Sequence, residues 1–111
     1  MSRRAWDINQ YIYPDASEEL FGRCVESNFD LVVMGHTHYP TLRRMGNTLL
    51  VNPGSVGQPR NRKPGASWAL FDTESGAVDL RTEQYDVTCL VGECRRRHSE
   101  LPYLYEVLSR V

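Results

Sequence analysis

The sequence predicts an α/β fold in which a mixed β-sheet is flanked by helices. Three patterns indicate it: a helical stripe of apolar residues near the N-terminus, a fully apolar run at residues 31–34, and two hairpin patterns after that run. A chain of 111 residues is one domain at most and can bury an ordinary core. A hydrophobic content of 41% and a charged content of 24% are typical of a soluble globular protein.

The first helix is expected over residues 15–28, after a lead-in loop at residues 1–14. Asp15 is followed three residues later by Glu18, which is the spacing of a capping box. Four apolar residues then recur at helical spacing: Leu20, Phe21, Cys24 and Val25. This helix should therefore pack one face against the sheet.

A short strand follows at residues 31–34, with the sequence Leu-Val-Val-Met. Continuous apolar, partly β-branched runs of this length are typical of strands buried on both faces, as in the inner sheets of α/β proteins. The sequence thus predicts a central strand here, and it ends at Gly35.

Two hairpins should complete the sheet structure. Gly46-Asn47 separates runs at 41–45 and 48–52, and two residues of this type mark a tight hairpin turn. The second hairpin pairs residues 67–71 with residues 77–83. Apolar and polar residues alternate in its return strand, so one face of that strand should be solvated.

The tail, residues 87–110, is predicted to be helical with a break. The apolar face of its first helix would contain Val87, Leu90, Val91 and Cys94. A second short helix should start near Pro102, because proline is favoured at an early helical position. Its buried stripe would consist of Leu104, Val107 and Leu108.

Charge is unevenly distributed, although the formal net charge is only −1. No Asp or Glu lies between Asp30 and Asp72, while basic residues and two histidines do. Such a segment favours an anionic ligand, with a solvated basic face as the alternative. The even overall balance gives no indication of nucleic-acid binding. With no signal peptide and no apolar run of bilayer length, we expect no membrane association and a cytoplasmic location.

Three cysteines form no disulfide framework, and reduced thiols are expected. Cys24 lies on the apolar stripe of the first helix and is expected to be a small core residue. Cys89, Cys94 and His98 match no common zinc-ligand spacing, and a fourth ligand is missing, so a zinc site is disfavoured.

The segment Gly35-His36-Thr37-His38 follows the apolar strand directly. Ligands of α/β proteins bind at the carboxyl ends of strands. In an extended chain, His36 and His38 would project to the same side and could both reach a metal site. Imidazole suits Mn, Fe, Zn or Ni, and the sequence leaves the choice among them open.

Residues 30–38, reading DLVVMGHTH, resemble the last metal motif of the calcineurin-like metallophosphoesterases. Residues 52–60, reading NPGSVGQPR, resemble the loop after a hairpin in the small bacterial and archaeal phosphodiesterase branch of that superfamily. Residues 9–15 and 85–87 are compatible with the same branch. The resemblance implies a β-sandwich flanked by helices and hydrolysis of phosphomonoesters or phosphodiesters at two divalent metal ions, with His36 and His38 each holding a different ion.

The resemblance also implies motifs that this chain lacks. The family pattern includes an earlier Asp-x-His, a Gly-Asp, a Gly-Asn-His-Asp/Glu block and a further lone histidine, and none of them is present. Asp7 and Asp15 match none of these motifs. We therefore expect residues 1–111 to form the C-terminal half of the family domain, with an incomplete metal site. No residue of the chain is assigned a catalytic role, and the isolated chain is expected to be inactive.

The loop at residues 52–60 has two interpretations. Backbone N–H groups around Gly54 and Ser55 could bind an anion, and Arg60 could contact a substrate phosphate. Alternatively, the prolines and glycines only set the turns of a rigid connector. Asn52 is expected to be a structural hydrogen-bonding residue rather than a ligand.

The alternative to an enzyme is a non-catalytic interaction module, a use of this fold that a retromer subunit exemplifies. In either case the resemblance implies that a second layer should cover the strand at residues 31–34, and this chain lacks it. We therefore expect either a missing N-terminal half or self-association through the uncovered sheet.

Overall fold

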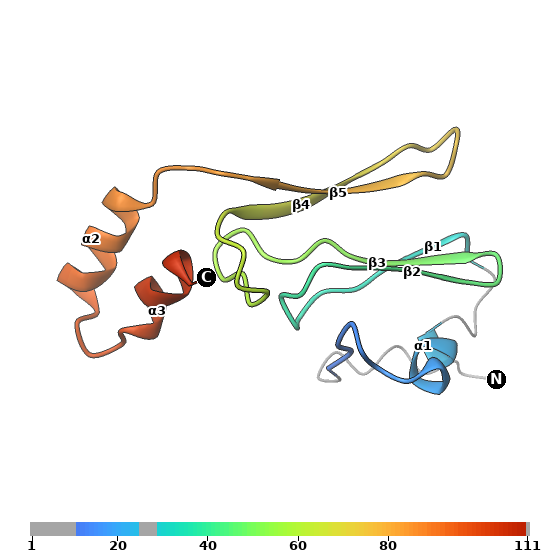
Figure 1. Ribbon diagram of the computed structural model, residues 1–111, viewed down its shortest axis with the longest axis horizontal. Coiled ribbons are helices and arrows are strands. Elements are labelled where there is room, and N and C mark those ends of the chain that lie inside the picture. Colours follow the sequence, from blue (N-terminus) through green and yellow to red (C-terminus); the bar gives the residue numbers. More distant parts are fainter. Residues whose placement is uncertain (1–10, 25–28, 111) are drawn as a thin grey trace.

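The computed structural model describes residues 11–24 and 29–110 (Figure 1). Its elements, in chain order, are α1 (Glu18–Cys24), β1 (Leu31–Val33), β2 (Thr41–Met45), β3 (Thr48–Asn52), β4 (Ala66–Phe71), β5 (Val78–Glu83), α2 (Thr88–Arg97), α3 (Tyr103–Glu106) and the 3-10 helix η1 (Val107–Ser109). Two sheets with helices at both ends confirm the expected α/β class.

The larger sheet has three strands in the order β1-β3-β2. β1 runs parallel to β3 and β2 runs antiparallel to it, so the sheet is mixed as predicted. All five residues of β3 are buried, because it is the middle strand. Gly46, with φ of 61°, provides the left-handed conformation that the tight β2–β3 turn needs.

The main core lies between this sheet and α1, which covers the sheet face opposite β4 and β5 (Figure 1). Phe21 of α1 is fully buried and its ring also receives the Arg43 guanidinium at 4.5 Å. The remaining core side chains are Ile12, Cys24, Val32, Met34 and Leu50. Burial raises the pKa of the Cys24 thiol, in keeping with the core role expected of this residue.

The start of α1 differs from the expected capping box. Ser17 Oγ accepts the N–H of Leu20 at 3.2 Å, so Ser17 caps the helix that begins at Glu18. Asp15 lies in a preceding turn, where the N–H of Ala16 donates to Tyr13 O at 3.0 Å. The end expected near residue 28 and the side chain of Val25 lie outside the described residues.

β1 was expected to be a central strand buried on both faces, and this prediction is wrong for the described part of the chain. β1 is an edge strand whose side chains alternate: Val32 is buried against α1, whereas Val33 is 63% exposed. The physical reason is the period of two in a strand, since α1 covers only one face of the sheet.

The second sheet is the hairpin β4–β5, which forms a separate layer (Figure 1). Val78 and Leu80 are half-buried while Asp79 and Arg81 are exposed, so the predicted alternation in the return strand is confirmed from Val78 to Arg81. It does not extend to Thr82, which is exposed like Glu83. In the connecting turn, Asp72 Oδ1 accepts the N–H groups of Glu74 at 2.8 Å and Ser75 at 3.2 Å.

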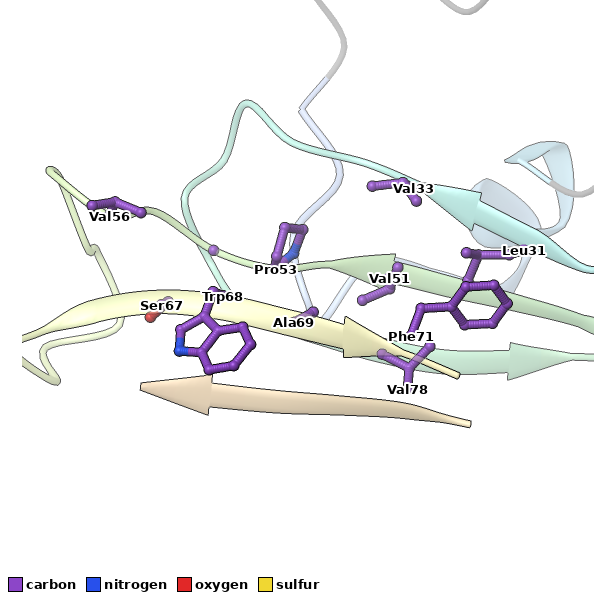
Figure 2. Close-up of a pocket in the computed structure, with 11 residues that line it drawn as sticks. Leu31, Val33, Val51, Pro53, Val56, Ser67, Trp68, Ala69, Phe71 and Val78 are labelled. Carbon is purple, nitrogen blue, oxygen red and sulfur yellow. The ribbon is translucent and has the colours of Figure 1, made fainter. Parts of the chain in front are cut away.

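An apolar hollow of ≈ 440 Å³ lies between the two sheets (Figure 2). β1 and β3 contribute Leu31, Val33 and Val51 to its lining, and the hairpin contributes Trp68, Ala69, Phe71 and Val78. Val33 remains 63% exposed there and Phe71 40%. The two sheets therefore face each other without closing a packed sandwich core within the described residues.

The tail forms α2, α3 and η1, as its pattern predicted. α2 buries none of its residues completely. Leu90 is 43% exposed while Val87, Val91 and Cys94 are half-buried, so its expected apolar face is only partly covered by other described residues. In the second part Val107 and Leu108 are buried and Leu104 is half-buried. Across the helices described here, none combines the length and apolar character needed to span a bilayer.

Candidate metal centre

His36 and His38 lie at the carboxyl end of β1, but not in extended chain. The strand ends at Val33, and both histidines adopt left-handed backbone conformations, with φ of 75° and 63°. The expectation that they project from an extended segment is therefore wrong. Left-handed conformations are unfavourable for non-glycine residues and persist where surrounding contacts enforce them, often at functional sites.

The imidazole of His38 is held in a defined tautomer. Its Nδ1 lies 3.1 Å from the carbonyl oxygen of Gln58. A carbonyl oxygen only accepts, so Nδ1 carries a proton, and in the neutral imidazole Nε2 then presents a lone pair. In a metal-binding histidine, the ring nitrogen that does not bind the metal often donates to a backbone carbonyl group, and this hydrogen bond fixes the orientation of the ring.

The loop at residues 52–60 positions that carbonyl group. Ser55 Oγ accepts the N–H of Gln58 at 2.9 Å, which fixes the turn around Gln58. On the other side, the N–H of Arg60 donates to His38 O at 3.5 Å. The loop thus contacts His38 through both its side chain and its backbone.

Asn52 joins this loop to the Gly-His-Thr-His segment. Its side-chain amide donates to Gly35 O at 3.2 Å and to Thr37 Oγ1 at 3.1 Å, and its Oδ1 accepts the N–H of Gly54 at 2.9 Å. Asn52 and Thr37 are both fully buried. These contacts confirm the structural role that the sequence indicated for Asn52.

Gly54 has a packing role that the sequence did not reveal. Its φ is +90°, and a Cβ at this position would lie 2.8 Å from Ser67 Cβ and 2.9 Å from Pro40 Cγ. Only glycine fits this conformation and space. The Gly54 N–H already donates to Asn52 Oδ1, so an anion would have to compete with this hydrogen bond. The anion-binding role expected of Gly54 stays a prediction.

His36 is exposed, and the ring of Tyr11 lies against it with 4.2 Å between centroids and 41° between planes. Sequence reasoning treated Tyr11 as part of a lead-in loop and missed this contact. The available signal was the alternation Tyr11-Ile12-Tyr13, in which the apolar Ile12 is flanked by two amphipathic rings.

Within residues 11–24 and 29–110, no group of three or more His, Cys, Asp or Glu side chains is placed to hold a metal ion. Cys89, Cys94 and His98 do not form such a group among these residues. His36 and His38 thus provide two nitrogen donors without a carboxylate partner among the described residues.

Comparison with known proteins gives consistent matches. The family model for the calcineurin-like phosphoesterase superfamily domain matches residues 8–76. An uncharacterised protein of Methanocaldococcus jannaschii is 32% identical over 97 residues, which cover 73% of this chain and 37% of that protein. A probable metallophosphoesterase of Methanothermobacter thermautotrophicus is 32% identical over 60% of this chain and 40% of its own length. The phosphodiesterase YfcE of Escherichia coli is 36% identical over 50% of this chain and 29% of its own length.

Solved structures agree on the fold. A hypothetical protein of Pyrococcus horikoshii superposes with a TM-score of 0.73 at 22% identity, over 92% of this chain and 41% of that one. A metallophosphoesterase from Sphaerobacter thermophilus superposes with a TM-score of 0.66 at 25% identity, over 76% of this chain and 42% of that one. The chain matches less than half the length of each of these proteins.

Proposed function

The chain belongs to the calcineurin-like phosphoesterase superfamily, and we propose that it supplies part of the divalent-metal site of an enzyme that hydrolyses phosphomonoesters or phosphodiesters. The observation that carries this proposal is the contact between His38 Nδ1 and Gln58 O, which leaves Nε2 to a metal ion. His36 lies two residues away at the same strand end.

His36 and His38 are the proposed metal ligands. Two neutral imidazoles suit Mn, Fe, Zn or Ni, so their chemistry fits the divalent ions that the family uses. When bound, such ions supply Lewis-acid polarisation of the phosphoester. The carboxylates that neutralise two cations would come from outside residues 11–24 and 29–110, so the site is incomplete within the part of the chain that the structure describes.

Arg60, Ser55 and Gly54 are the proposed substrate contacts. The backbone N–H of Arg60 donates to His38 O, so the Arg60 side chain leaves the backbone next to the histidines. The absence of Asp and Glu between Asp30 and Asp72 leaves a positive field there, which favours a phosphate group. Ser55 contributes chiefly by fixing Gln58, and through it His38.

The test uses the protein expressed from its complete gene. Manganese-stimulated hydrolysis of p-nitrophenyl phosphate or its bis ester is expected. His36→Ala and His38→Ala should each lose about 100-fold or more of this activity, because each change removes a proposed metal ligand. The matched control is His98→Ala, because His98 is the third histidine and lies in the tail, 3.7 Å from Glu100. The isolated 111-residue chain should show no turnover that depends on His36.

The second candidate is a non-catalytic protein-interaction module. It is favoured by the apolar hollow, whose lining residues Val33 and Phe71 are exposed. A complete-gene protein that hydrolyses neither ester with any divalent metal would favour this candidate over the enzyme.

A further inference from the structure

Three tyrosines lie in a row that starts at His36. The Tyr11 ring contacts the His36 imidazole at 4.2 Å between centroids. The Tyr13 ring follows, nearly parallel to that of Tyr11, at 5.9 Å and 11°. Tyr39 ends the row with an edge contact to Tyr13 at 5.8 Å and 70°. Tyr11, Tyr13 and Tyr39 are called the tyrosine row below.

The tyrosine row is held in place by the core without being part of it. Ile12, between the first two tyrosines, is 8% exposed and packs in the main core. Tyr11 and Tyr13, on either side of Ile12 in the chain, are 49% and 39% exposed. Tyr39 joins them from the segment that contains both histidines.

A purely structural role of the tyrosine row explains this arrangement only in part. Rings that shielded the core would themselves be covered, yet about half of Tyr11 stays in solvent although it already contacts His36. Exposed aromatic faces are sites on which planar groups stack, and every nucleobase or aryl ring offers a matching face.

We infer that the tyrosine row receives a planar aromatic group of the phosphoester, so that the preferred substrates carry a nucleobase or an aryl ring. This inference rests on the proposed function, because it places the phosphate at His36. A ring attached to that phosphate then lies beside Tyr11 and Tyr13. Stacking on an aromatic side chain strengthens binding by about tenfold or more per ring.

The experiment measures binding rather than turnover, by isothermal titration calorimetry on the complete-gene protein. Two pairs of probes differ in the ring: adenosine 5′-monophosphate with ribose 5-phosphate, and phenyl phosphate with methyl phosphate. Within at least one pair, the ring-bearing ester should bind about tenfold more tightly. Saturation-transfer NMR should show contact at its ring protons.

Variants separate stacking from a structural effect. Tyr11→Leu and Tyr13→Leu should remove most of the preference for the ring while leaving the affinity for the ring-free ester within about twofold. Tyr11→Phe keeps the ring and should keep the preference. The control is Tyr103→Leu, since Tyr103 on α3 is 52% exposed and lies outside the row.

Each outcome decides the question. A preference in the nucleotide pair assigns a nucleobase, and a preference only in the phenyl pair assigns an aryl ester. Equal affinity within both pairs, or an equal loss for both classes in Tyr11→Leu, would overturn the inference while leaving the proposed function intact. A protein that binds none of these four monoesters would overturn this inference. The proposed function would fall with it only if the bis ester were not hydrolysed either.

Discussion

Asn52 donates its side-chain amide to the hydroxyl oxygen of Thr37 at 3.1 Å, and both side chains are fully buried. Thr37 separates the two candidate metal ligands, and Asn52 ends the middle strand of the sheet. This hydrogen bond therefore links the Thr37 side chain to the most buried strand, and the same amide also donates to the backbone of the segment at Gly35 O, at 3.2 Å. It explains how two left-handed histidines, one on either side of Thr37, are maintained beyond the end of a three-residue strand.

Replacing Asn52 by Ala should lower the free energy of unfolding by about 2–3 kcal/mol. The change removes three hydrogen bonds. It leaves the part-buried Gly54 N–H without its Asn52 partner, and the buried Thr37 hydroxyl keeps, among the described residues, only the N–H of Tyr39 at 3.4 Å. Urea denaturation measures the loss, with Thr73→Ala at an exposed turn position as the control. A loss no larger than that of the control would show that this link does not stabilise the fold.

Gly54→Ala should destabilise the protein by about 2 kcal/mol or more, whereas Gly57→Ala should cost less than about 1 kcal/mol. Gly54 combines a φ of +90° with a Cβ position 2.8 Å from Ser67, while a Cβ at Gly57 meets nothing within 4 Å. The two variants lie in one loop, and they differ mainly in whether the added Cβ is strained and collides with neighbouring atoms. Equal urea midpoints would contradict the packing role given to Gly54.

Metal binding by the isolated chain should be weak and should not exceed one ion per chain. His36 and His38 offer two neutral donors, and no described carboxylate joins them to neutralise a second cation. Calorimetric titration with Mn²⁺ or Zn²⁺ checks the stoichiometry, and binding should disappear in His38→Ala but persist in His98→Ala. Two tightly bound ions per chain would mean that carboxylates reach the histidines from another copy.

The isolated chain should self-associate at micromolar concentration through the faces that line the apolar hollow. Val33 is 63% and Phe71 is 40% exposed there, and burying each side chain would contribute about 1.5 kcal/mol, or about tenfold in association. Light scattering should show a shift towards monomer in Val33→Lys and Phe71→Lys. Leu90→Lys, at a residue 43% exposed on α2, serves as the control. A compact wild-type monomer with a sharp cooperative melt would contradict this prediction.

Asp72 should stabilise the β4–β5 turn in a pH-dependent way. Hydrogen bonds from the backbone N–H groups of Ser75 and Glu74 lower its pKa below the ordinary value of 3.8. A group whose pKa is lowered by folding contributes fully above its unfolded pKa and loses that contribution as the pH falls through the folded value. The difference in urea midpoint between wild type and Asp72→Ala should thus be constant above about pH 5 and shrink below the ordinary pKa. If the difference in urea midpoint stayed constant down to pH 2, the ionised carboxylate of Asp72 would not be the cause of the stabilisation.

Local sequence patterns were enough to predict several strands and turns and the candidate metal ligands. The Gly46-Asn47 pair predicted the β2–β3 hairpin, the alternation from Val78 predicted the solvated return strand, and the Gly-His-Thr-His segment marked the candidate metal ligands. These features depend on turn chemistry and on side-chain period, which are properties of neighbouring residues. The membership in the superfamily followed from two such local motifs in the correct order.

Only the tertiary structure decided which faces of these elements are covered and which distant residues come into contact. Val32 and Val33 are identical in type and adjacent, yet one is buried by α1 and the other is exposed at the hollow, because coverage depends on which layers the chain brings to each face. In the same way, the contact of Tyr11 with His36 and that of Gln58 with His38 join residues 25 and 20 positions apart. Contacts at such separations depend on the path of the whole chain, which no local pattern encodes.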